Sequence, residues 1–212
     1  MTNIKSPKIL KNAISSMQRD EIAEHVITRP QIYNLFDKDI GRKSADIDPK
    51  YIDRKSLSAE IYHLLDAIVA ENFSDTAIPS YFKWFQYSPR HGKPALPAHL
   101  DDNACTYTVD IQLRSSVKWP VWVNAEEFLC EDLDALLYYG VDQLHWRPKF
   151  TGHKYDDYVE VLIAHYAEPD HWYFGNPDDY PVHKADYHAN YKKREKEMIE
   201  KYFHESMFYH QK

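Results

Sequence analysis

The sequence contains few of the features that mark secreted or membrane proteins. Only two of its 212 residues are cysteine, Cys105 and Cys130, which is too few for a disulfide framework or a structural zinc site. No apolar run approaches the roughly 20 residues that cross a bilayer. The N-terminal segment MTNIKSPKILKNAISSMQRDEIAEH lacks the apolar stretch of a secretory signal. We therefore expect a cytoplasmic protein without a membrane partner.

An excess of positive charge is also missing. The sequence has 26 Lys and Arg against 33 Asp and Glu, which makes the formal net charge −7. Proteins that bind nucleic acids neutralise phosphates with clustered Lys and Arg, so no nucleic-acid partner is expected. What is present is a chain that is 43% apolar and 15% aromatic. These values are typical of a globular protein with a sizeable core, and the length fits one domain over residues 1–212.

The first part of that domain, residues 1–78, is expected to be helical. The segment SSMQRDEIAEHVIT begins with Ser15 and Gln18 at the spacing of a capping box. Its predicted buried stripe comprises Met17, Ile22, Val26 and Ile27. A second helix is predicted for LSAEIYHLLDAIVAENF, because its apolar residues recur at i, i+3 and i+4. They are Ile61, Leu64, Leu65, Ile68 and Val69.

After Pro79 the hydrophobic period changes from that of a helix to that of a strand, and a β-core is predicted over residues 80–170. TYTVDIQL alternates between an apolar set, Tyr107, Val109, Ile111 and Leu113, and a polar set. SYFKWFQYS, KWPVWVN, DALLYYG and YVEVLIAHY are further predicted strands. No helical pattern interrupts them, so we expect antiparallel strands closed as a barrel or jelly roll. Residues 182–210 are predicted to form a charged, solvated helix.

The pair His99 and Asp101 stands just before the alternating strand. Side chains two apart in a strand point the same way, so this pair can present a nitrogen and an oxygen to one point. A His-x-Asp motif alone is weak evidence. His145, just after a strand-like run, supplies a third donor, and two imidazoles with one carboxylate form the facial triad of non-haem Fe(II) oxygenases. The alternative is that His145 is a strand-end histidine bonded to backbone.

The segments PAHLDDN, KWPVWVN and DALLYYGVDQLHWRPKFTGHKYDDYVEVLIAHY resemble the 2-oxoglutarate/Fe(II)-dependent dioxygenases, and more narrowly their prolyl-4-hydroxylase-like branch. Members carry, in this order, His-x-Asp, a WP strand, a GDALLY-like strand, HWREPF and a VFLHY-like strand. Two positions depart from that pattern. Leu133-Asp134 stands where the branch tends to have Gly-Asp, and Pro148 follows HWR directly. Neither is a predicted ligand, so these departures concern the branch more than the metal site.

The resemblance implies a mainly β protein with flanking helices (α+β) and a double-stranded β-helix core of the jelly-roll or cupin-like type. It also implies that His99, Asp101 and His145 hold Fe(II) and that 2-oxoglutarate and O2 are co-substrates. A Lys or Arg near the second histidine is then expected to bind the far carboxylate of 2-oxoglutarate, because charge-assisted bonds to carboxylates are strong. Lys154 and Arg147 are the leading candidates, with Lys149 and His153 as further possibilities.

Several aromatic residues and histidines remain open. The hydroxyl of Tyr107 is a candidate for the same carboxylate, with a core position as the alternative, and Tyr87 is a weaker candidate of this kind. His165 and His171 are expected to have structural or surface roles.

The predicted activity is oxidative decarboxylation of 2-oxoglutarate coupled to hydroxylation of a substrate C–H bond. The substrate is a prolyl residue of a peptide or protein, or else a small molecule. The alternatives are a cupin-type metal-dependent hydrolase or isomerase, and a non-catalytic binding module on the same fold. The sequence does not indicate an oligomeric state.

Overall fold

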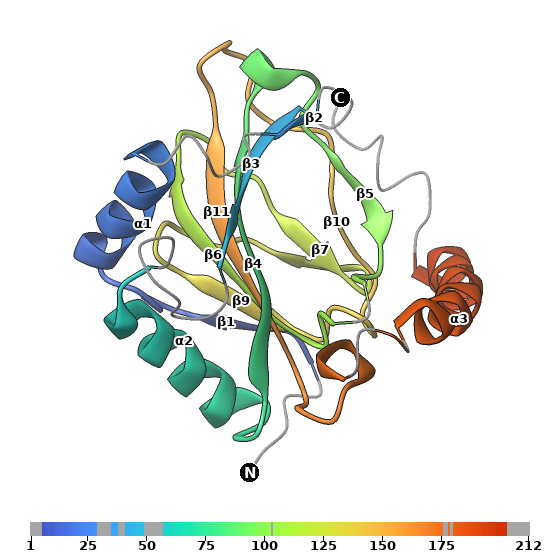
Figure 1. Ribbon diagram of the computed structural model, residues 1–212. Coiled ribbons are helices and arrows are strands. Elements are labelled where there is room, and N and C mark those ends of the chain that lie inside the picture. The colour runs from blue at the N-terminus through green and yellow to red at the C-terminus, as the bar shows by residue number, and fades with distance from the viewer. Residues whose placement is uncertain are drawn as a thin grey trace.

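A computed structural model describes residues 6–28, 35–37, 41–48, 57–102, 104–175, 178 and 180–202. Two antiparallel sheets form its centre (Figure 1). In the seven-stranded sheet the order is β1 (Lys8–Leu10), β9 (Ala135–Tyr138), β6 (Tyr107–Ser115), β11 (Val159–Ala167), β4 (Ile78–Tyr87), β3 (Arg42–Ile47) and β2 (Leu35–Asp37). In the four-stranded sheet it is β5 (Leu96–His99), β10 (His145–Arg147), β7 (Val121–Val123) and β8 (Glu126–Phe128).

All the strand pairs of the described residues are antiparallel, as predicted. The N-terminal part is not only helical, however, because β1, β2 and β3 come from it and join the larger sheet at its two edges. Part of residues 1–78 therefore belongs to the β-core, through these three strands. Such short strands carry too few residues to show a clear alternation, which is why the sequence pattern missed them.

Two helices cover the outer face of the seven-stranded sheet (Figure 1): α1 (Ser16–Thr28) and α2 (Ala59–Asn72). The predicted capping box precedes α1, because the Ser15 N–H donates to Gln18 Oε1 at 2.8 Å and the Gln18 N–H donates to Ser15 Oγ at 3.2 Å. The predicted stripe on α1 is only half right. Ile22 and Val26 are buried, but Met17 and Ile27 are 81% and 70% exposed. Ile22 and Val26 share a helix face, whereas Ile27 is turned about 100° from Val26.

The alternation in β6 separates two environments. Its apolar residues Val109, Ile111 and Leu113 are buried in the main core beneath the helices. Its polar residues Thr108, Asp110 and Gln112 are also buried, on the face toward the second sheet. The polar side of this strand is thus the inner side of a two-sheet sandwich.

Leu133, one of the two departures from the family pattern, has a left-handed backbone conformation with φ 75°. Its N–H donates to the Gln112 carbonyl at 2.7 Å. The turn therefore keeps the conformation that glycine favours, even though the residue is a leucine. The next residue, Asp134, accepts hydrogen bonds from Lys11 Nζ at 2.7 Å and from the Asn12 N–H at 3.1 Å, which ties β1 to this turn.

The C-terminal helix α3 (Tyr180–Tyr202) is present, but it is not merely a solvated tail. It packs on the outer side of the four-stranded sheet, against residues on both sides of the predicted metal ligands (Figure 1). The part of the predicted helix beyond residue 202 lies outside the described residues. Two single-turn 3-10 helices, η2 (Pro89–His91) and η3 (Trp172–Phe174), complete the described elements. Within this part of the chain, no helix combines the length and apolar character required to cross a membrane.

Candidate metal centre

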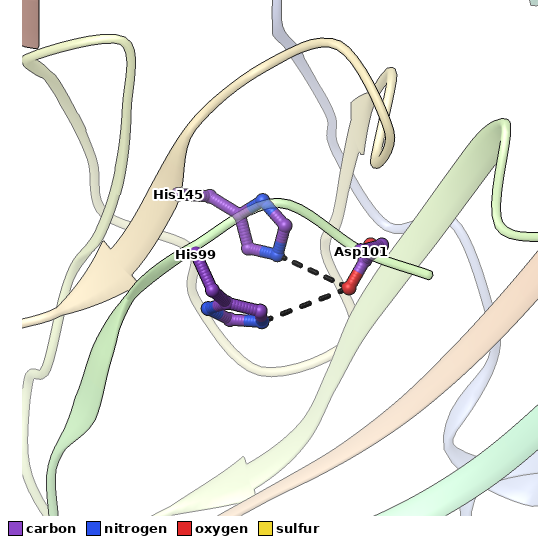
Figure 2. A group of neighbouring side chains, drawn as sticks. All are labelled: His99, Asp101 and His145. Atoms are coloured by element: carbon purple, nitrogen blue, oxygen red, sulfur yellow. Dashed lines mark ion pairs between the residues drawn. The ribbon is translucent and has the colours of Figure 1, made fainter. Parts of the chain in front are cut away.

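The three residues that the sequence singled out come together in space (Figure 2). His99 is the last residue of β5 and His145 the first of β10, and their Cα atoms are partners in the antiparallel pairing of these strands. Asp101 follows β5, and its N–H donates to the Gly140 carbonyl at 2.9 Å. This places donors that are far apart in the chain at one edge of the smaller sheet.

The donor atoms converge on one point. His145 Nε2 lies 3.3 Å and His99 Nε2 lies 3.7 Å from Asp101 Oδ1 (Figure 2). One donor atom from each residue lies within 4.8 Å of those of the other two. Two imidazole nitrogens and one carboxylate oxygen at this separation are the ligand set of a divalent transition metal that keeps other coordination positions open.

The second nitrogen of each ring makes a hydrogen bond to backbone. His99 Nδ1 lies 2.9 Å from the Pro97 carbonyl, and His145 Nδ1 lies 2.9 Å from the Gln143 carbonyl. A carbonyl accepts only, so in the neutral form of each ring Nδ1 is the protonated nitrogen and Nε2 keeps its lone pair. Lone pairs on three converging atoms repel one another unless a cation lies between them. The donor set therefore fits a metal ion.

The electrostatics of the site favour the metal-binding forms of two of the three residues, His99 and Asp101. Burial lowers the pKa of His99 to about 4, and the neighbouring His145 adds to this effect. For Asp101, burial alone would raise the pKa, but the imidazoles of His145 and His165 outweigh it and hold the pKa below its usual range. For His145 the balance is reversed, because the Asp101 carboxylate outweighs burial and raises the pKa of the ring. At neutral pH His99 is therefore uncharged and Asp101 ionised.

Asp101 is supported by a residue that sequence reasoning missed. Thr108 Oγ1, on the inner face of β6, donates to Asp101 Oδ2 at 3.2 Å and lies 3.0 Å from His165 Nδ1. His165, for which a structural or surface role was expected, is buried beside this threonine, 3.8 Å from Asp101 Oδ2. The sequence did contain a signal for this role of Thr108, because Thr108 belongs to the polar set of β6. A polar side chain that is buried on one face of a strand needs a hydrogen-bond partner on that face.

Gly140, whose carbonyl accepts the hydrogen bond from the Asp101 N–H, also lies beside the Asp101 side chain. A Cβ atom at this position would lie far inside contact distance of Asp101 Oδ2 and 2.6 Å from Thr108 Oγ1. The carboxylate therefore occupies space that only a glycine leaves free.

A cavity of about 420 Å³ opens between the two sheets beside the three donors, within the range of roughly 300–1,000 Å³ that is usual for ligand pockets. Its wall includes Tyr87 and Tyr138, the first of which was a weaker candidate for binding the co-substrate. Three cationic side chains also line the cavity in the described part of the chain. They are Arg42, Lys83 and Arg147.

Arg147 is the buried cation of this cavity. Its Nη1 donates to the Trp119 carbonyl at 3.0 Å, its Nη2 donates to Asp110 Oδ2 at 3.3 Å, and its guanidinium lies 5.0 Å from the centre of the Trp119 ring. Burial raises the pKa of the Asp110 carboxyl, against the opposing effect of Arg147. Asp110 Oδ1 is buried without a hydrogen-bond partner in the described structure. The cavity wall thus presents the oriented guanidinium of Arg147 next to the Asp110 carboxyl group, whose Oδ1 atom accepts no hydrogen bond in the described structure.

Two further candidates for the co-substrate carboxylate, Lys154 and Tyr107, lie elsewhere. Lys154 is exposed in the loop before β11, where its N–H donates to Asp157 Oδ2 at 2.8 Å, and it does not line the cavity. Tyr107 lies on the helix-covered face of the large sheet, where its hydroxyl donates to Glu168 at 2.7 Å and its ring stacks on Phe73. Tyr107 thus occupies the core position that was its alternative, because the apolar set of β6 faces the helices and the polar set faces the cavity.

No family model and no curated protein matches the sequence. Solved structures do match the fold. A prolyl hydroxylase from Trichoplax adhaerens, in complex with a peptide fragment of the hypoxia inducible factor oxygen degradation domain, matches with a TM-score of 0.56 at 13% identity over 82% of this chain and 88% of that chain. A Phytophthora capsici prolyl 4-hydroxylase matches with a TM-score of 0.55 at 11% identity, over 96% and 77%. The fold is that of the 2-oxoglutarate/Fe(II) oxygenases.

HygX from Streptomyces hygroscopicus, with nickel and 2-oxoglutarate bound, matches with a TM-score of 0.53 at 8% identity, over 77% of this chain and 83% of that chain. The double-stranded β-helix predicted for the core is therefore confirmed. Identities this low relate the folds only. The assignment of roles to residues rests on the geometry described above.

Proposed function

We propose that this protein is an Fe(II)- and 2-oxoglutarate-dependent dioxygenase that hydroxylates a substrate C–H bond. The observation that carries the proposal is the convergence of His99, Asp101 and His145 beside a cavity, in a fold shared with oxygenases of this kind. When bound, iron and 2-oxoglutarate would supply the oxidising chemistry, with O2 as the oxidant.

The residues of the chain have separate tasks in this proposal. His99, Asp101 and His145 hold the metal on one side and leave the side toward the cavity open. Thr108 holds the Asp101 carboxylate in place by its hydrogen bond. The aromatic wall, which includes Tyr87 and Tyr138, excludes water from the site where a reactive oxidant is generated.

Arg147 is the residue that we assign to the far carboxylate of 2-oxoglutarate. It is buried at the cavity wall, and its two existing hydrogen bonds fix the guanidinium in one orientation. A buried, oriented guanidinium binds a carboxylate more strongly than a solvated ammonium does, which argues for Arg147 over the exposed Lys154. Arg42 also lines the cavity with a cationic side chain, and it was not among the residues predicted from the sequence to bind the co-substrate.

For the substrate, we propose a prolyl residue in a peptide or protein. Support comes from the prolyl hydroxylases among the structural neighbours, one of them bound to a peptide. HygX has been solved with hygromycin B bound beside nickel and 2-oxoglutarate, so a protein of this fold also binds a small molecule. Mass spectrometry of prolyl peptides incubated with the enzyme, Fe(II), 2-oxoglutarate and O2 tests this part. The gain of one oxygen atom on proline supports it, whereas hydroxylation of small molecules alone contradicts it.

The central experiment is anaerobic reconstitution with Fe(II) followed by 2-oxoglutarate. The oxygenase should develop a visible charge-transfer band when the keto acid chelates the iron, and it should release succinate when O2 is admitted. A hydrolase or isomerase of cupin type should show neither signal, and a binding module should form no succinate. Succinate formation equal to that of Asp101→Ala contradicts the proposed function, because that variant lacks the carboxylate ligand.

A further inference from the structure

Helix α3 covers the back of the metal site. Leu100 lies between the two ligands His99 and Asp101, and Leu144 and Trp146 flank the third ligand, His145. These three apolar residues are buried together on the side of the strands away from the donors, as alternation along a strand requires. The side chains that α3 packs against them are Tyr191, Met198, Ile199 and Tyr202.

The helix also binds the backbone of the metal-binding segment directly. The Tyr191 hydroxyl donates to the Leu100 carbonyl, and the Leu100 N–H donates to Glu195 Oε1 at 3.2 Å. Tyr191 and Glu195 are one helical turn apart, and the same Glu195 oxygen lies 3.0 Å from the Tyr191 hydroxyl. Two side chains of α3 therefore hold both polar backbone groups of the residue between His99 and Asp101.

The second ligand-bearing segment is held by the same helix. Arg194 forms an ion pair with Asp142, which lies in the loop that leads into β10 and His145. Both partners are about half exposed, so this pair contributes little by itself. It shows, however, that α3 contacts both chain segments whose pairing brings the ligands together.

We propose that α3 positions the metal ligands, so that docking of the helix and binding of the metal are coupled. The inference rests on the proposed function only in requiring that the three donors bind a metal. Leu100 cannot shift without moving His99 and Asp101 on either side, and the two hydrogen bonds to α3 restrict that shift. Coupling of this kind is reciprocal: the docked helix strengthens metal binding, and the bound metal strengthens docking.

The test measures the Mn²⁺ dissociation constant of the full-length protein by calorimetry. Tyr191→Phe keeps the ring and removes only the hydroxyl, and Glu195→Ala removes the acceptor for the Leu100 N–H. Each should weaken Mn²⁺ binding by about tenfold, since loss of a residue that orients metal ligands commonly lowers the metal affinity by about 10–100-fold. Glu195→Gln keeps an acceptor oxygen and should retain most of the affinity. Lys196→Gln, at an exposed position of the same helix, is the matched control and should bind Mn²⁺ as the wild type does.

A merely structural role of α3 would lower the melting temperature of the variants without changing the affinity of the folded protein. Hydrogen exchange provides the second measurement. Mn²⁺ should slow exchange of the Leu100 amide and of α3 in the wild type, and slow α3 much less in Tyr191→Phe. Equal Mn²⁺ affinity in wild type, Tyr191→Phe and Glu195→Ala would overturn the coupling and leave the oxygenase proposal intact. A wild-type protein that binds no Mn²⁺ or Fe(II) would overturn both.

Discussion

His99 and His145 face each other across the antiparallel pairing of β5 and β10, with their ring centres 4.3 Å apart. Each ring is held by a hydrogen bond from its Nδ1 to a backbone carbonyl two residues earlier, at Pro97 and at Gln143. The two imidazoles are thus oriented locally by the backbone, and they are brought together by strand pairing.

Removal of one imidazole tests the metal site directly. His145→Ala should weaken Mn²⁺ binding by more than about 100-fold. Loss of a metal ligand should cost more affinity than loss of a residue that only orients a ligand, which commonly costs roughly 10–100-fold. Equilibrium dialysis or calorimetry measures the change. His153→Ala, in an exposed loop, is the control and should bind as the wild type does. Unchanged affinity in His145→Ala would show that the metal is bound elsewhere.

Metal binding should weaken on acidification, first through the protonation of His145. The pKa of His145 is raised by the Asp101 carboxylate, whereas the pKa of His99 is lowered by burial to about 4. Metal binding requires neutral imidazole, so acidification below the pKa of His145 should lower the Mn²⁺ affinity by about tenfold per pH unit, the effect of one displaced proton. A second proton should contribute only near pH 4.

Calorimetry in buffers of different ionisation enthalpy counts the protons released on Mn²⁺ binding. Release approaching one proton as the pH falls below the pKa of His145 agrees with the electrostatics of the site. Release of two protons there would contradict the lowered pKa of His99.

The space beside Asp101 can be tested with one methyl group. In Gly140→Ala the new Cβ collides with the Asp101 carboxylate and approaches Thr108 Oγ1 to 2.6 Å, so Asp101 must move. We expect the free energy of unfolding to fall by about 1–3 kcal/mol, which is typical of an overpacked site, together with a loss of Mn²⁺ affinity. Chemical denaturation and calorimetry measure the two effects. Gly175→Ala, where the nearest atom would be 3.2 Å away, should change neither strongly. Wild-type metal affinity in Gly140→Ala would contradict this account.

Mutation can distinguish the two basic residues, Arg147 and Lys154, that are candidates for binding the far carboxylate of 2-oxoglutarate. Arg147→Lys keeps the charge but loses the planar group that bonds Trp119 and Asp110, so 2-oxoglutarate should bind the Mn²⁺-loaded protein about tenfold more weakly, or about 1.4 kcal/mol. Lys154→Gln should have no effect, because that side chain does not line the cavity. The measurement is titration with 2-oxoglutarate at saturating Mn²⁺. A loss confined to Lys154→Gln would reverse the assignment.

Much of the fold could be predicted because its signals are local. The capping box at Ser15 and the alternation in β6 are patterns within a few residues, and the structure contains both. The strands of the N-terminal part were missed because their partners, rather than their own sequences, define them. The position of Tyr107 stayed open for a related reason. Alternation shows that β6 has two faces, but it does not show which of them is covered by helices and which faces the cavity.

By itself, the sequence determined the chemical types of the site: two imidazoles and a carboxylate, in an order that matches an oxygenase pattern. Only the tertiary structure decided that Arg147 rather than Lys154 borders the cavity, that Thr108 supports Asp101, and that the charged C-terminal helix holds Leu100. The reason is physical. Residue type and spacing set what a side chain can bond and where it points along its own strand, whereas its partners belong to distant segments that only sheet pairing and helix docking bring within reach.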